Sequence, residues 1–110
     1  MALVANFQDT VLTNAAVNII PPSSFASTWV VAASAVNTDT ANAHTVSIYR
    51  VPSGQTALSQ YLIIDNNVVL PGQTITLGLN GQALTADATF QGLADTSGVI
   101  NINLSYVSTN

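Results

Sequence analysis

The segment STWVVAASAVN, residues 27–37, is the strongest strand candidate in the sequence and decides the fold class. Its aromatic and β-branched residues favour extended structure. Read with a period of two, the segment is apolar on both faces. Such a strand belongs at the centre of a sheet or against a partner. We expect Trp29 foremost as a core residue of this strand, with the stacking of a ligand on its ring as the alternative.

Strand and turn patterns continue on both sides of this segment. The return strand is expected at residues 44–51, after a turn at residues 38–42. Prolines and glycines, which end ladders and permit tight turns, separate the strands further along, and Asn80-Gly81 predicts a type I′ hairpin turn. The other expected strands are residues 7–14, 16–20, 59–65, 68–70, 74–79, 88–94 and 99–107. This spacing predicts an all-β fold: a two-sheet antiparallel β-sandwich, jelly-roll-like, with about eight strands.

The chain has the length of one domain and carries very little charge. A single β-sandwich domain is expected over residues 1–110, with residues 1–6 as a candidate N-terminal arm. Only 5% of the residues are charged and 48% are hydrophobic, whereas typical domains carry roughly 25% charged residues. Surfaces that pack against other proteins avoid charge because each buried charge costs desolvation. The composition therefore predicts a subunit with a protein partner.

The same composition argues against several other partners. The net charge is −4 and Arg50 is the only Lys or Arg, whereas binding to nucleic acid or to an anionic membrane needs several cations. Neither partner is expected. The chain has no cysteine, so disulfides and thiolate metal sites are not available to it. Residues 1–6 lack the pattern of a secretion signal, and the longest apolar run, residues 29–36, is far too short to span a bilayer, so synthesis in the cytoplasm is expected.

Titratable residues suggest two kinds of catalytic site, and each has a structural alternative. His44, the only histidine, could form a Ser-His-Asp triad with Asp39, but serines are frequent and no G-x-S-x-G motif is present. Asp87 and Asp95 could face each other as paired carboxylates, but Asp is also an ordinary turn former. We expect His44 to open a strand and both aspartates to form turns, and we expect the protein not to be an enzyme.

A third cluster could offer oxygen ligands to calcium. Asn37, Asp39 and Asn42 lie in one predicted loop, but they lack the spacing of a calcium-binding loop and carry one formal charge. Asn and Asp in such positions usually form Asx turns. The sequence therefore predicts no metal site, and it contains no motif that predicts a cofactor.

Four residues are candidates for an interface. Arg50 is expected to pair with an aspartate, either within the chain or across an interface, where arginine is a frequent contributor to binding. Trp29, Tyr49 and Tyr61 are the aromatic side chains that a carbohydrate site would use.

Several phrases of the sequence resemble one protein family. The phrases are residues 36–40 with 44–54, residues 69–74, the Leu-x-x-Asp step at residues 84–87, and residues 98–106. They resemble strand and turn phrases of small β-sandwich virion accessory proteins of tailed bacteriophages, over roughly residues 27–106. The sequence departs from the pattern at Ala86, where the similar phrase often has glycine. The phrases contain no catalytic residues.

The resemblance implies a capsid decoration or cement subunit that binds the lattice of the major capsid protein. It further implies a homo-oligomer at the capsid surface of the virion, made in the host cytoplasm and without a cofactor. The alternative is a phage tail or fibre module that binds a glycan on the host surface.

Overall fold

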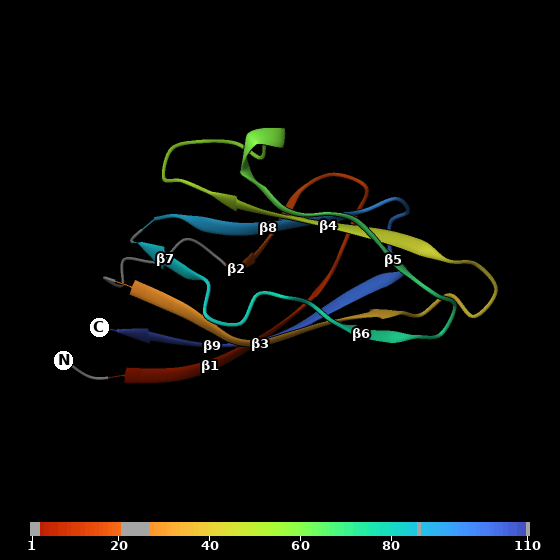
Figure 1. Ribbon diagram of the computed structural model, residues 1–110, viewed down its shortest axis with the longest axis horizontal. Coiled ribbons are helices and arrows are strands. Elements are labelled where there is room, and N and C mark those ends of the chain that lie inside the picture. Colours follow the sequence, from red (N-terminus) through yellow and green to blue (C-terminus); the bar gives the residue numbers. More distant parts are fainter. Residues whose placement is uncertain (1–2, 21–26, 86, 110) are drawn as a thin grey trace.

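The computed structural model describes residues 3–20, 27–85 and 87–109 (Figure 1). These residues form β strands and one short 3-10 turn, η1 (Ser59–Tyr61). The strands are β1 (Leu3–Val11), β2 (Val17–Ile20), β3 (Ser27–Asn37), β4 (His44–Val51), β5 (Leu62–Val69), β6 (Thr74–Thr76), β7 (Ala83–Thr85), β8 (Thr89–Ala94) and β9 (Ile100–Thr109). Within the described ranges, no helix is long and apolar enough to cross a membrane.

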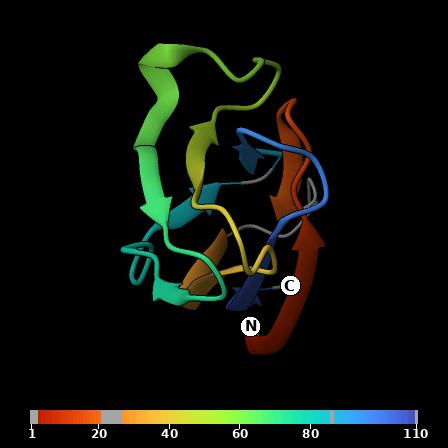
Figure 2. The same ribbon diagram turned by 90° about the vertical axis from the view of Figure 1, so that its right-hand side faces the viewer.

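The strands form two antiparallel sheets that pack face to face (Figures 1 and 2). The large sheet has the order β1-β9-β3-β6, with β7 also paired to β3, and the small sheet has the order β2-β8-β4-β5. Because β6 and β7 pair in succession with the two ends of β3, they act as one interrupted strand. Each sheet then has four strands in the order of a jelly roll. The predicted all-β, two-sheet sandwich is confirmed.

The core lies between the sheets and is filled from alternate positions of the strands. The central strand β8 contributes Phe90, which is fully buried, and Gly92. A Cβ atom on Gly92 would lie 3.1 Å from a methyl of Ile48 and 3.2 Å from one of Leu12, so glycine lets the facing side chains pack closely there. The largest fully buried side chains are Phe90, Leu12, Ile19, Ile20, Ile48, Leu77, Leu79, Ile100, Ile102, Val30, Val46 and Val51.

A β-bulge in β3 determines which of its residues face the core. The pairing of β3 with β9 shifts between Val30 and Ala32, which leaves Val31 as an inserted residue. Even-numbered residues are buried before the bulge and odd-numbered residues after it. Trp29 and Val31 therefore lie outside, 38% and 50% exposed. The prediction of Trp29 as a core residue is wrong, because a period of two counted through the segment misses the inserted residue.

The segment expected as an N-terminal arm is part of the large sheet as far as the structure describes it. Residues 3–6 begin β1, which pairs with β9 from Leu3↔Thr109 to Val11↔Asn101 without a break in register. Residues 1 and 2 lie outside the described ranges. The prediction of a free arm is wrong for residues 3–6, because their partner strand lies about a hundred residues away in the sequence and gives no local signal.

Two local predictions also fail at irregular points in edge strands. Residues 59–65 and 68–70 were expected as separate strands, but β5 continues through Asn66, whose φ of 48° accommodates an irregular register with β4. The Asn80-Gly81 turn has a positive φ at Gly81 and none at Asn80, so it is not of type I′. The strands beside it, β6 and β7, pair with β3 instead of with each other.

Candidate interaction surface

The outer face of the large sheet carries a group of exposed apolar side chains. We call it the outer patch and define it as Ala5, Phe7, Trp29, Val31 and Ala32. Phe7 is 78% exposed, the highest value among the large exposed hydrophobic side chains. Apolar side chains gathered on one face of a soluble protein usually mark a binding site.

The register of three strands brings the outer patch together. Trp29 of β3 and Ala5 of β1 are both paired with Val107 of the intervening strand β9. Phe7 and Ala32 are both paired with the next outward residue of β9, Ser105. The bulge places Val31 beside them, and Phe7 and Val31 line the same open hollow of about 370 Å³. The patch thus depends on residues that are far apart in the sequence.

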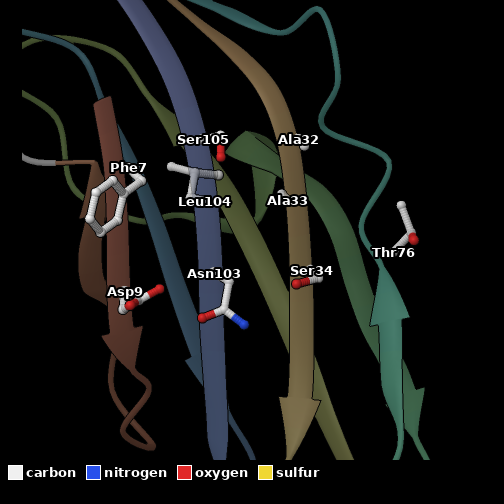
Figure 3. Close-up of a pocket in the computed structure, with 9 residues that line it drawn as sticks. All are labelled: Phe7, Asp9, Ala32, Ala33, Ser34, Thr76, Asn103, Leu104 and Ser105. Carbon is white, nitrogen blue, oxygen red and sulfur yellow. The ribbon is translucent and has the colours of Figure 1, made fainter. Parts of the chain in front are cut away.

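Next to the outer patch, polar residues cross all the strands of the sheet in one row. We call this the polar row: Asp9, Asn103, Ser34 and Thr76 are paired in succession from β1 to β6. Figure 3 shows these side chains beside Phe7 around an open hollow of about 420 Å³. The face therefore joins an apolar half to a polar half that can exchange hydrogen bonds and that includes one carboxylate, Asp9. That composition suits the core and rim of a protein interface.

The four predicted interface residues do not gather at one place, although Arg50 and Tyr61 line the same open hollow of about 170 Å³. Only Trp29 belongs to the outer patch. Tyr49 of β4 is paired with Gln91 of β8, whereas its neighbour Ile48 faces the core, so Tyr49 lies on the outer face of the small sheet. Tyr61, in η1, precedes the strand that pairs with β4. Trp29 and Tyr49 thus face opposite sides of the sandwich, so the three aromatic residues named for a glycan site do not form a single cluster.

Arg50 joins β4 to the segment between β6 and β7 by a hydrogen bond, and it forms no ion pair with the described residues. It is paired with Phe90 on the inner face of β4, and its Nη1 donates a hydrogen bond to Oε1 of Gln82, at 2.8 Å. Among the described residues, the ion pairs all involve His44. The predicted pairing of Arg50 with an aspartate of the same chain is therefore wrong for these residues, and pairing across an interface stays a prediction.

His44 forms a second polar feature, at one end of the sandwich. It is largely buried, its Nε2 lies 2.9 Å from Oδ2 of Asp39, and its Nδ1 lies 2.9 Å from Oδ1 of Asp95. Ionised carboxylates only accept hydrogen bonds, so the protonated ring, in which both nitrogens donate, satisfies both contacts. His44 opens β4, as expected, and joins the loop after β3 to the turn after β8. We call His44, Asp39 and Asp95 the histidine clamp.

The charges of the histidine clamp shift its titration. The hydrogen bond to Asp39, and then the charge and hydrogen bond of Asp95, raise the pKa of His44 against the opposing effect of burial. The pKa of Asp39 lies well below its usual range because His44 and the backbone N–H of Ala41 donate hydrogen bonds to it. A Ser-His-Asp mechanism needs one ring nitrogen free to take the proton of serine. In His44 both are occupied by carboxylates, which favours a structural role.

Other titratable residues act as turn formers. Oδ1 of Asp39 accepts hydrogen bonds from the backbone N–H groups of Ala41 and Asn42, as in an Asx turn. Asp87 lies in a turn with a φ of 64°, and its predicted partner Asp95 contacts His44 instead. Within the described ranges, the structure has no cluster of three or more His, Cys, Asp or Glu side chains suited to hold a metal ion.

Replacing His44 with glutamine is expected to lower the melting temperature most between about pH 4 and pH 6.5. Because folding raises the pKa of His44, the protonated ring stabilises the folded protein. This stabilisation is complete below the pKa of the unfolded state, about 6.5, and is lost as the pH rises through the pKa of the folded state. Because folding lowers the pKa of Asp39, the ionised carboxylate also stabilises the folded protein. This stabilisation is present above the pKa of the unfolded state, about 3.9, and is lost as the pH falls through the pKa of the folded state. Thermal unfolding of both proteins across this range measures the difference. An equal difference at about pH 5 and about pH 9 would contradict the clamp.

Comparison with known proteins gives the fold class. No protein-family model matches the sequence, and no curated protein matches it. Solved structures do share the sandwich. A chain of the Bacillus endospore appendages, a family of disulfide-linked pili, has a TM-score of 0.56 at 14% identity and covers 99% of this chain and 87% of its own. A chain of the T13 IBDV viral particle has a TM-score of 0.50 at 8% identity and covers 98% of this chain and 31% of its own.

At these identities the likeness shows the fold alone. The two proteins are components of large structural assemblies, a pilus and an icosahedral virus particle. This chain has no cysteine and cannot form the disulfides that link those pili. The resemblance to accessory proteins of tailed phages stays a prediction.

Proposed function

We propose that this protein is a structural subunit that docks on a larger protein assembly through the outer face of its large sheet. The observation that carries the proposal is the outer patch, where Phe7, Trp29 and Val31 are exposed on a chain with very little charge. Tryptophan and other aromatic side chains supply much of the binding energy at protein interfaces. Docking would remove the patch from water without burying an unpaired charge.

The assembly we propose is a bacteriophage capsid, with the lattice of the major capsid protein as the partner. The phage-like phrases of the sequence support this choice, and so does the occurrence of the fold in a virus particle and a pilus. Many copies on one shell would bind with avidity even where each interface is small. A tail or fibre module that binds a glycan has less support, because Trp29 and Tyr49 lie on opposite faces.

Replacing Val31 with aspartate is expected to weaken binding to capsids by about tenfold or more, because the carboxylate would be desolvated in an apolar contact. The matched control is Val68→Asp: Val68 lies in β5 of the small sheet and is 53% exposed, against 50% for Val31. Co-sedimentation with purified capsids of a tailed phage that carries this chain measures the binding. Thermal unfolding of each variant shows that it is folded.

Salt gives a second criterion for the same experiment. Because the outer patch is apolar, binding should change little between low salt and about 0.5 M salt, where the screening length between charges is only about 4 Å. The proposal fails if the unaltered protein does not sediment with capsids, if salt abolishes binding, or if Val68→Asp weakens binding as much as Val31→Asp.

A further inference from the structure

The edges of the two sheets differ in how well they are protected against pairing with another strand. Edge strands are usually short, bulged or interrupted, which discourages such pairing. In the small sheet, β2 has four residues and an irregular register, and β5 is distorted at Asn66. In the large sheet, the edge made by β6 and β7 is interrupted between them. Three of the four edges are therefore protected.

The fourth edge, β1, has none of these protections within the described residues. It has nine residues in unbroken register with β9, contains no proline or lysine, and pairs with β9 alone among the described strands. Figures 1 and 3 show it as the outermost strand of the large sheet. Phe7 lies at its midpoint and projects from the outer face. A long regular edge with exposed apolar side chains is suited to accept a strand.

We propose that β1 pairs antiparallel with β1 of a second copy, about a two-fold axis that passes beside Phe7. A two-fold axis makes an interface self-complementary, so residue i of one copy lies opposite residue j of the other whenever j lies opposite i. With Phe7 as the centre, all nine residues of Leu3–Val11 find a partner. Any other centre leaves residues at one end of the strand unpaired.

The only charge on β1 favours the same register. With Phe7 at the centre, Asp9 lies opposite Ala5 of the second copy. The two Asp9 residues are then four residues apart along the strands, about 14 Å, which exceeds the screening length of about 8 Å at physiological salt. A register centred on Asp9 would place the two carboxylates directly opposite each other, which destabilises a strand pair.

Apolar contact favours this register as well. The two Phe7 rings, each 78% exposed in the single chain, would lie opposite each other on the same face of the joined sheet. Because the axis runs perpendicular to the sheet, the outer patches of both copies would face the same side. The inference does not depend on the capsid proposal: it concerns the isolated protein, whereas docking concerns a different molecule.

Single cysteines test the register, because the natural chain contains no cysteine. Opposed residues of antiparallel strands have Cα atoms about 4.5–5.5 Å apart, within the range that a disulfide spans. Phe7→Cys should therefore form a disulfide-linked dimer under mild oxidation. Ala5→Cys alone and Asp9→Cys alone should not, since equivalent residues are about 14 Å apart, but an equimolar mixture of these two variants should. Equal crosslinking of all three single variants, or none with Phe7→Cys, would overturn the proposal.

A charge at the axis tests the association without any crosslink. Sedimentation equilibrium of the unaltered protein should show a dimer at high protein concentration, and Phe7→Lys should raise its dissociation constant about tenfold or more by opposing two ammonium groups. Val68→Lys, on the distorted edge β5, is the matched control and should leave the dimer unchanged. Circular dichroism shows that each variant is folded. A strictly monomeric natural protein, or equal effects of the two lysines, would refute the dimer and leave capsid docking untouched.

Discussion

Replacing Phe90 with alanine is expected to lower the free energy of unfolding by about 3–5 kcal/mol, a large part of the about 5–15 kcal/mol that stabilises a domain. Phe90 is fully buried in β8, between β2 and β4 of the small sheet. Its removal loses the transfer energy of the ring and leaves a cavity between the sheets. Urea denaturation followed by tryptophan fluorescence and circular dichroism measures the change.

The matched control for Phe90 is the exposed phenylalanine of the large sheet. Phe7→Ala, measured at a dilution that keeps the protein monomeric, should change the free energy of unfolding by no more than about 0.5 kcal/mol. If Phe90→Ala cost less than about 1 kcal/mol, the packing between the sheets would have to be looser than the structure shows.

Replacing Asn37 with alanine is expected to cost about 3 kcal/mol or more, since it removes the hydrogen bonds of a fully buried side chain and takes this donor from the buried carbonyl of Val69. The side chain is fully buried. Its Nδ2 donates to the carbonyl oxygens of Asn42, Val69 and Leu70 at 2.9, 3.1 and 3.3 Å. Its Oδ1 accepts the backbone N–H of Asp39 at 2.9 Å. Asn37 thus joins the end of β3, the following loop and the end of β5.

The chemistry of Asn37 can be tested apart from its volume. Asn37→Asp keeps the size but replaces the donor amide with a carboxylate that faces carbonyl oxygens, so it should destabilise at least as much as alanine. Asn67→Ala, at an exposed position of β5, is the control and should fall within about 0.5 kcal/mol of the natural protein. A loss below about 1 kcal/mol for Asn37→Ala would show that water replaces these hydrogen bonds.

The local patterns of the sequence predict most strands but not their irregularities. The bounds of residues 27–37 and 44–51 are confirmed, because β-branched residues and flanking turn formers determine them locally. The inserted Val31 cannot be distinguished in the sequence from the valines and alanines around it. A regular alternation of faces along residues 27–37 therefore predicts the wrong side of the sheet for Trp29. The turn at Asn80-Gly81 was predicted from a hairpin signal, whereas β3 provides the partner for both flanking strands.

The candidate sites depend on contacts that local patterns do not contain. Asp95 reaches His44 across 51 positions of the sequence, and Phe7 joins Ala32 through a strand near the C-terminus. Asn37, which ends β3, and Asp39, in the loop after it, form the expected Asx turns, because the side-chain oxygen of each accepts the backbone N–H two residues further on. The burial of the Asn37 side chain was not foreseen, because burial depends on β5 closing over it.

The position of β9 has a consequence for how the chain folds during synthesis. β9 is the last of the described strands in sequence order, yet it lies between β1 and β3 and forms the centre of the large sheet. A ribosome releases the N-terminal residues first, so β1 and β3 emerge long before the strand that pairs with both. Until then their apolar side chains remain uncovered, and the sheet closes only through contacts distant in sequence, which form slowly. Truncation before Ile100 would therefore leave two long strands without their shared partner and prone to aggregate.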